Sequence, residues 1–293
     1  MGKINRGVRS VSSPQDKPGA AGEPTRADWA AGAENIMGKS YDTYFSSGLY
    51  QSRYPRPNRR TLRLLEQVLP REGRLLDYGA GEGRYCLAIA KSRAARVVAV
   101  DISSAARSTL ADRAQLMGLA ESISICEPGD AIYRAELDAP GRFDVALLAF
   151  GVLGHIAGRS HRLALLSELR DALSPQGCLV LGLPNAARRF RAEQARHAPH
   201  VRAGELEQGD IYYTRVSEAG HVPLFYHLFH RSEIDADLTE AGFAIERLTS
   251  ESMFPETAVT NSKALGLIDD LACTALPADW GYGYLVIARP RRS

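Results

Sequence analysis

Short apolar runs alternate with amphipathic segments along most of the chain, a pattern typical of an α/β fold. Residues 96–103 are the clearest case, because a continuous apolar run ending in an acid suits a parallel strand buried on both faces. The pattern predicts strands at residues 74–76, 96–103, 122–126, 143–150, 243–248 and 283–288, a turn and strand within 174–183, and helices at 58–68, 85–90, 162–173, 231–241 and 258–273.

Capping residues bound the helix expected at 231–241. Ser232 is expected to cap its N-terminus and Gly242 to end it, because Ser is a preferred N-cap and Gly readily adopts the conformation that follows a helix. The strand at 243–248 begins directly after this glycine.

A glycine-rich loop joins the first predicted strand to the helix that follows it. The segment reads Leu-Leu-Asp-Tyr-Gly-Ala-Gly-Glu-Gly-Arg-Tyr over residues 75–85, with glycines at every second position from 79 to 83. In open α/β sheets, ligands bind at the carboxyl ends of the parallel strands. Glycines leave no Cβ between the backbone and a ligand, so this loop predicts a cofactor site.

The spacing of the glycines and the position of the next acid restrict the class of cofactor that the loop can bind. A dinucleotide fingerprint reads G-x-G-x-x-G, whereas this loop reads G-x-G-x-G after Asp77. Asp101 ends the next strand about twenty residues beyond Gly81, where a carboxylate can accept both ribose hydroxyl hydrogens. The spacing therefore favours a nucleoside-containing cofactor other than a nicotinamide dinucleotide.

These motifs, with three further ones in the same order, resemble those of class I S-adenosylmethionine (SAM) methyltransferases. The further matches are Glu-Pro-Gly-Asp-Ala at residues 127–131, Gly-Val-Leu-Gly-His-Ile at 151–156, and Leu-Ser-Pro-Gln-Gly at 173–177. Gln176 stands where many members have a glycine, a departure that affects only a turn. The resemblance implies a Rossmann-like seven-stranded sheet with helices on both faces, an antiparallel pair at its end, an N-terminal helical cap and lid insertions.

The same resemblance implies SAM as cofactor, with S-adenosylhomocysteine (SAH) as product, and a set of binding residues. The acid of the third motif would bind the adenine amino group. The residues that would contact the cofactor are Asp77, Gly79, Ala80, Gly81, Gly83, Asp101, Ile102, Asp130, Ala131 and Phe150, with Tyr41 and Arg53 from the N-terminal element.

The chain divides into a tail, a cap and a catalytic domain. Residues 1–34 contain few large apolar side chains and are expected to form a disordered tail. Residues 35–70, rich in aromatics, are expected to form a helical cap, from which Tyr41, Arg53 and Tyr54 are candidates to touch the methionine end of SAM or the acceptor. Residues 71–293 would form the SAM-binding domain, interrupted by insertions at about 185–222 and 250–280.

Composition excludes several other classes. A net charge of +2 and a hydrophobic fraction of 45% describe an ordinary globular protein without a strong field for nucleic acid. No apolar run approaches the roughly 20 residues of a membrane span, and the N-terminus lacks a signal-peptide core, so a cytoplasmic location is expected. The four scattered cysteines are expected to be reduced, and no metal site is expected from the His-x-x-His pairs at 197–200 and 227–230.

Methyl transfer chiefly requires alignment of donor and acceptor, and a base is needed only when the acceptor must lose a proton. His155, which follows the fourth strand, is the first candidate base, although a packing role is equally open to it. Tyr226 and His227 are candidates to line the acceptor pocket, although their segment could also be a buried strand.

The acceptor itself stays open. The preferred hypothesis is methylation of an O or N atom of a small molecule. Patches such as Tyr41-Asp42, Arg53-Tyr54-Pro55 and residues 225–229 also resemble the tRNA wobble-uridine methyltransferase group, so tRNA is the first alternative. A SAM-binding regulatory protein without catalysis is an alternative of another class, and the glycine spacing argues against a nicotinamide-dependent dehydrogenase.

Overall fold

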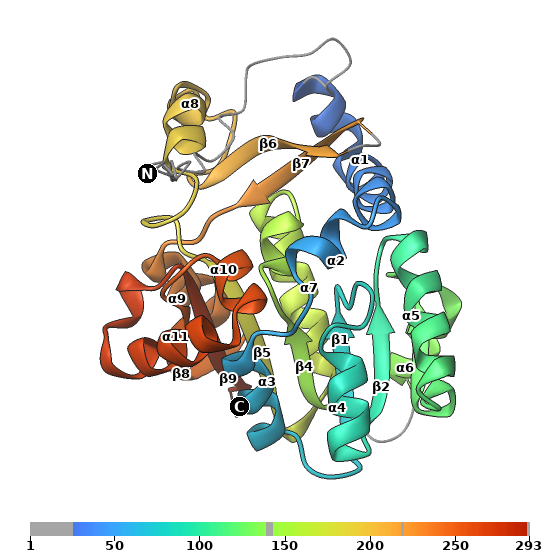
Figure 1. Cartoon of the computed structure of the whole chain (residues 1–293). Coiled ribbons are helices and arrows are strands. Elements are labelled where there is room, and N and C mark those ends of the chain that lie inside the picture. Colours follow the sequence, from blue (N-terminus) through green and yellow to red (C-terminus); the bar gives the residue numbers. More distant parts are fainter. Residues whose placement is uncertain (1–25, 139–142, 218–219, 292–293) are drawn as a thin grey trace, which may run out of the picture.

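A seven-stranded sheet with helices on both faces forms the centre of the molecule (Figure 1). The computed structural model describes residues 26–138, 143–217 and 220–291. Its strands are β1 (Arg74–Tyr78), β2 (Arg96–Val100), β3 (Ile123–Cys126), β4 (Phe143–Leu148), β5 (Leu173–Pro184), β6 (Asp210–Ser217), β7 (Gly220–His227), β8 (Phe243–Ser252) and β9 (Gly283–Pro290).

The helices flank this sheet and cover one of its ends. They are α1 (Arg26–Ser46), α2 (Leu49–Arg53), α3 (Arg59–Val68), α4 (Cys86–Arg93), α5 (Ser104–Leu116), α6 (Ala131–Asp138), α7 (Arg159–Ala172), α8 (Arg191–Arg202), α9 (Arg231–Glu240), α10 (Glu256–Asn261) and α11 (Lys263–Ala275), with short 3₁₀ helices η1 (Ala120–Ser122), η2 (Val152–His155) and η3 (Ala278–Trp280).

The strand order is β3-β2-β1-β4-β5-β9-β8, which confirms the predicted fold. Strands β1 to β5 pair in parallel, and β9 runs antiparallel between β5 and β8. Because alternate residues of a strand face opposite sides, Leu75 packs in one core layer with α3, α4 and α5, while Leu76 packs in the other with α6, α7 and α9. This double burial accounts for the continuous apolar runs.

A separate hairpin of β6 and β7 covers the carboxyl ends of the parallel strands, together with α1 (Figure 1). Met37 and Tyr44 of α1 pack against Val222, Leu224 and Phe225 of β7. The hairpin belongs to the insertion after β5, which extends through β7 to residue 227 rather than ending near 222.

Three local expectations are wrong. Residues 26–34 lie in α1 rather than in a disordered tail, whose remaining residues 1–25 fall outside the described residues. His230, not Ser232, is the N-cap of α9, and its side chain makes no capping hydrogen bond. The helix expected at 258–273 is divided into α10 and α11, because the hydroxyl of Ser262 accepts a hydrogen bond from the Leu265 N–H and begins a new helix.

Candidate active site

A cavity of about 930 Å³ lies between the carboxyl ends of the parallel strands and the elements that cover them. The sheet supplies polar and small residues to its wall, and the cover supplies mostly aromatic ones. The sheet side includes Asp77, Gly79, Ala80, Gly81, Asp101, Ile102 and Phe150, and the cover includes Tyr41, Tyr44, Tyr50, Tyr54, Tyr213 and Tyr226.

The glycine loop bends through left-handed backbone conformations at Gly79 (φ 79°) and Gly81 (φ 55°). A Cβ on Gly79 would overlap the side chain of Val152, and one on Gly81 would lie 3.2 Å from the ring of Phe45. Gly83 is different, because it does not line the cavity and its missing Cβ makes room for Leu87 and Leu110. Gly83 therefore serves helix packing, and its expected contact with the cofactor is corrected.

Asp101 holds the glycine loop against the end of β2. Its Oδ2 accepts a hydrogen bond from the Gly81 N–H at 2.7 Å, and its Oδ1 accepts one from the Ser103 N–H at 2.8 Å. Each oxygen keeps a second lone pair for a further donor, such as a ribose hydroxyl. Burial raises the pKa of Asp101 to about 6, although these two amide hydrogen bonds oppose the rise.

Asp77 offers a buried carboxylate oxygen without a partner. Its Oδ2 is inaccessible to solvent and makes no hydrogen bond with any described residue. Burial, and secondly the charge of Asp101, raise the pKa of Asp77 to about 7. Asp77 lines the cavity, so its ionised carboxylate would attract a cationic group bound there, and the ammonium of SAM has the required charge.

In the Glu-Pro-Gly-Asp-Ala motif at residues 127–131, the residues that reach the cavity differ from the expected ones. Asp130 and Ala131 do not line the cavity, whereas Pro128 does. The carboxylate of Asp130 accepts hydrogen bonds from the backbone N–H groups of Glu127 and Tyr133, which caps the start of α6. The expected adenine contact of Asp130 stays a prediction.

Arg53 also lies outside the cavity wall, and Arg84 stands there instead. The Arg84 guanidinium lies 4.7 Å from the centre of the Phe150 ring and 5.5 Å from that of Tyr54. It forms a 2.8 Å ion pair with Glu256 of α10, so its charge is already balanced. The sequence offered a weak signal for Arg84, which directly follows the third glycine of the loop.

His155, in the cavity wall, lies between the rings of Tyr226 and Tyr41. Its ring stacks on Tyr226 at 4.3 Å and meets Tyr41 edge-on at 5.4 Å. Its Nδ1 lies 2.9 Å from the Phe225 carbonyl oxygen, which can only accept, so Nδ1 carries the proton and Nε2 is an acceptor. Burial lowers the pKa of His155 to about 4, so the ring is neutral near pH 7.

Two glycines let β7 approach the loop after β4. A Cβ on Gly151 would overlap the hydroxyl of Tyr226, and a Cβ on Gly154 would overlap the backbone carbonyl of His227. The fourth motif thus provides the surface on which the covering hairpin rests. Tyr226 reaches the cavity as expected of a pocket residue.

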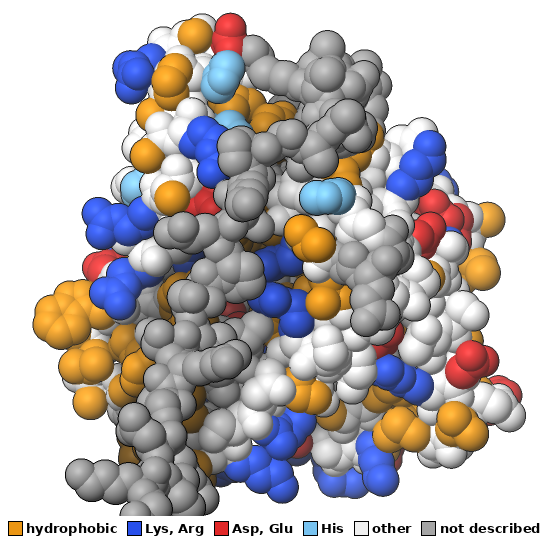
Figure 2. Space-filling model, turned by 45° about the horizontal axis from the view of Figure 1, so that its top comes forward, with side chains coloured by type: hydrophobic (Ala, Val, Ile, Leu, Met, Phe, Trp, Pro, Cys, Tyr) orange, Lys and Arg blue, Asp and Glu red, His pale blue; other side chains and the backbone are white. Residues whose placement is uncertain are grey.

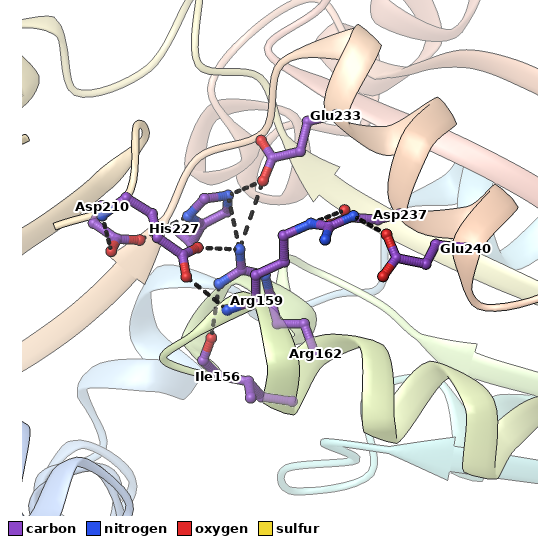
Figure 3. A network of polar contacts seen from close by, with 9 residues as sticks. Ile156, Arg159, Arg162, Asp210, His227, Glu233, Asp237 and Glu240 are labelled. Carbon is purple, nitrogen blue, oxygen red and sulfur yellow. Dashed lines mark hydrogen bonds and ion pairs between the residues drawn. The ribbon is translucent and has the colours of Figure 1, made fainter. Parts of the chain in front are cut away.

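His227, the next residue of β7, points away from the cavity into a buried polar network (Figure 3). Its Nδ1 lies 2.7 Å from Asp210 and its Nε2 lies 2.6 Å from Glu233. Although burial alone would lower the pKa of His227, the hydrogen bonds that its ring donates to these two carboxylates raise it. His227 is therefore a structural cation, and its assignment to the acceptor pocket is corrected.

The same network contains metal-ligating residue types. Glu207, Asp210 and His227 have ligand atoms within 4.8 Å of one another. However, the fully buried Arg162 places a guanidinium nitrogen 2.6 Å from Glu207 and 3.6 Å from Glu233 (Figure 3). An arginine already supplies the positive charge that a metal would bring, so we interpret the cluster as an ion-pair network.

Two arginines of the cavity wall were missed by sequence reasoning. Arg189 belongs to the basic run 188–191, and Arg215 lies on β6. Arg189 lies among aromatic rings, 4.9 Å from the centre of Tyr282 and 5.4 Å from that of Tyr226. Nothing in the local sequence separates Arg189 from its exposed neighbour Arg188.

Comparison with solved structures gives the same fold. The CcbJ methyltransferase from Streptomyces caelestis aligns with a TM-score of 0.56 at 16% identity over 81% of this chain and 91% of that one. A SAM-dependent methyltransferase from Methanosarcina mazei aligns with a TM-score of 0.57 at 18% identity over 78% and 98% of the two chains. The 1,6-didemethyltoxoflavin-N1-methyltransferase of Burkholderia thailandensis, with SAH bound, aligns with a TM-score of 0.54 at 19% identity over 95% and 94%.

The sequence matches no curated protein sequence. None of the helices in the described ranges is both long and apolar enough to span a bilayer. A family model described as a methyltransferase domain matches residues 50–248, well over half of the chain. The protein therefore belongs to the methyltransferase-domain family.

Proposed function

We propose that the protein transfers the methyl group of SAM to a nitrogen or oxygen atom of a small molecule held in the cavity under the β6–β7 hairpin. The observation that carries this proposal is the continuity of the cavity, which runs from Asp77 and the glycine loop to His155 and Tyr226. Its volume of about 930 Å³ is at the upper end of the range for ligand sites. Such a volume leaves space for an acceptor beside the cofactor.

The residues of the sheet side suit the cofactor. The unpartnered Oδ2 of Asp77 fits an ammonium group, the left-handed glycines 79 and 81 keep the loop free of side chains, and Asp101 retains lone pairs for hydroxyl donors. When bound, SAM supplies a methyl group on a positively charged sulfur, which leaves as a neutral thioether.

The chain's own contribution is to orient the acceptor and to exclude water. Aromatic side chains are the largest group in the cover, and holding reactants in a near-attack arrangement can lower a barrier by about 7–11 kcal/mol. His155 is a poor proton acceptor because burial lowers its pKa to about 4. Burial raises the pKa of Tyr50 to about 12 and that of Tyr226 further, so both hydroxyls remain protonated.

This protonation pattern favours an acceptor atom with a lone pair already available, such as an amine or ring nitrogen, or an oxygen that ionises without help. One protein of the same fold, the 1,6-didemethyltoxoflavin-N1-methyltransferase, is named for methylation at a nitrogen, which agrees with this preference. On the face seen in Figure 2, Lys and Arg side chains are interspersed with hydrophobic and neutral ones. A mixed surface of this kind suits a small-molecule acceptor.

Calorimetric titration with SAH tests the cofactor site. Gly81→Arg should abolish binding, because the new side chain would enter the cavity. Gly118→Arg is the matched control, since Gly118 has a similar φ of 66° but is exposed, with no atom within 4 Å of its missing Cβ. Retained SAH affinity in Gly81→Arg, or equal loss in both variants, would overturn the site assignment.

The acceptor class is tested by transfer of a labelled methyl group. Wild-type protein and labelled SAM are incubated with a small-molecule extract or with bulk tRNA. We expect label in the small-molecule fraction, and none from Gly81→Arg. Label confined to tRNA would replace the proposed acceptor class, and label in neither fraction despite SAH binding would favour a non-catalytic SAM-binding protein.

A further inference from the structure

Two arginines in the cavity wall have charges that no described carboxylate balances. Arg189 follows β5 and Arg215 lies on β6, and both side chains line the cavity. Among the side chains that the structure describes, neither forms an ion pair, whereas Arg84, Arg159 and Arg162 all do. Both arginines are half-buried, and a charge withdrawn from water without a partner is costly, which points to a ligand that supplies the opposite charge.

Aromatic rings orient these guanidiniums without neutralising them. Arg189 stands over the rings of Tyr226 and Tyr282, and its Nη1 lies 3.4 Å from the Tyr226 hydroxyl oxygen. Its Nε is buried and has no hydrogen-bond partner among the described residues. The Arg215 guanidinium lies 5.1 Å from the centre of the Tyr213 ring. Stacking of this kind fixes the direction of each guanidinium and leaves N–H donors for an anion.

Two acids of the cavity wall pair with cations other than Arg189 and Arg215. Glu207 pairs with Arg162, and Asp210 pairs with His227 (Figure 3). Glu251 is close enough to feel the charge of Arg189, but burial and the neighbouring Glu256 raise the pKa of Glu251 to about 8, so it is mostly neutral at pH 7. These three acids therefore do not neutralise Arg189 and Arg215.

The cofactor's acidic partners lie on the other side of β4. Asp77 lies near the end of β1, Asp101 follows β2 and Arg189 follows β5, and β4 stands between β1 and β5 in the sheet. Arg189 and Arg215 are instead next to Tyr213 and Tyr226 of the covering hairpin. Their position is that of the acceptor rather than of the nucleoside.

We propose that the acceptor is an aromatic or heteroaromatic acid, whose anionic group is bound by Arg189 and Arg215 while its flat ring packs against Tyr213 and Tyr226. This inference rests on the proposed function and adds the chemical class of the acceptor. A planar guanidinium binds a carboxylate or sulfonate through two parallel hydrogen bonds, which orients the ring as well as attracting it.

The test uses two fluorescent probes that differ in one group. 8-Anilinonaphthalene-1-sulfonate is an anionic aromatic compound, and N-phenyl-1-naphthylamine has the same rings without the sulfonate. Each is titrated into SAH-saturated protein. We expect wild type to bind the sulfonate at least about tenfold more tightly than the neutral probe, since hydrogen bonds to charged groups are strong. Arg189→Gln and Arg215→Gln should each remove about tenfold of the sulfonate affinity, and change the affinity for the neutral probe and for SAH less than twofold.

Arg188→Gln is the matched control, because Arg188 is exposed and adjacent to Arg189, and it should leave all three affinities unchanged. Equal binding of the two probes by wild type, or sulfonate binding insensitive to both cavity variants, would overturn the inference. A loss of SAH affinity in Arg189→Gln equal to the loss for the sulfonate would assign that arginine to the carboxylate of the cofactor instead. Absence of SAH binding by wild type would mean that the proposed function itself fails.

Discussion

The unpartnered carboxylate of Asp77 leads to a pH dependence that can be measured without knowing the acceptor. The pKa of Asp77 is raised to about 7 by burial and by Asp101, so about half of the cofactor-free protein has this group protonated at pH 7. The ammonium of SAH requires the ionised form. Binding should therefore lower the pKa of Asp77 and release a proton, and affinity should increase with pH.

The size of the effect follows from the fraction of protein with ionised Asp77. That fraction is about one tenth at pH 6, one half at pH 7 and nine tenths at pH 8 for a pKa of about 7. Because apparent affinity is proportional to the competent fraction, SAH should bind about tenfold more tightly at pH 8 than at pH 6. Calorimetry at pH 7 in two buffers of different ionisation enthalpy should show about half a proton released per SAH bound.

Asp77→Asn is the control, since it keeps the shape and removes the charge. Its SAH affinity at pH 8 should be at least about tenfold weaker than that of wild type, as expected for a lost charged hydrogen bond. Any dependence that persists near pH 6 would come from Asp101, whose pKa is about 6. Wild-type affinity that is constant from pH 6 to 8, with no proton release, would refute the assignment of Asp77 to the ammonium.

The same variant should stabilise the cofactor-free protein. The folded-state pKa of Asp77 lies above the usual value for the unfolded chain, so its contribution to stability is present at low pH and is lost as pH rises from about 4 through 7. The melting temperature of Asp77→Asn should exceed that of wild type by a margin that grows toward pH 8. A lower melting temperature at pH 8 would show that the carboxylate has a stabilising partner.

Three further predictions concern the covering hairpin. Gly151→Ala should destabilise the protein by about 2 kcal/mol in urea unfolding, because its Cβ overlaps the Tyr226 hydroxyl, and a cost unchanged in a Tyr226→Phe background would contradict this cause. His227→Gln should lower the free energy of unfolding by about 3 kcal/mol at pH 6 and by less at pH 9. The pKa of His227 is raised in the folded protein, so the stability that its imidazolium contributes is lost as pH rises above about 6.5. The control His221→Gln, at an exposed position, should change the free energy of unfolding little at either pH. The C2 proton of His155 should keep one NMR chemical shift from pH 5 to 8, since burial lowers its pKa to about 4, and a titration near pH 6.5 would reinstate it as a candidate base.

The sheet was predictable because its signals are local. Strand β2 and the last four residues of β4 are buried on both faces and therefore read as apolar runs, and the glycine loop has its own spacing. Helix α1 was partly missed because the expectation counted large apolar side chains, whereas the residues before Asn35 are rich in alanine, a strong helix former, and continue a helix that Met37 and Tyr44 anchor.

The residues of the cavity were only partly predictable, because the role of a residue type depends on what surrounds it in the fold. Asp130 follows a strand, as Asp101 does, yet its carboxylate caps α6. Arg188 and Arg189 are adjacent and identical, yet one is exposed and the other is stacked on tyrosines. Neither difference has a local signal, since each depends on which distant element packs nearby.

Strand β7 connects the buried ion-pair network with the wall of the cavity. Its side chains alternate, so Tyr226 enters the cavity while His227 joins Asp210 and Glu233 in the network beside α7 and α9 (Figure 3). The ion pairs thus set the position of a strand whose other face forms the acceptor wall. The glycine loop and Asp77 lie on the sheet, on the opposite side of the cavity from this hairpin. Substitutions that break these ion pairs should therefore weaken acceptor binding more than they weaken cofactor binding.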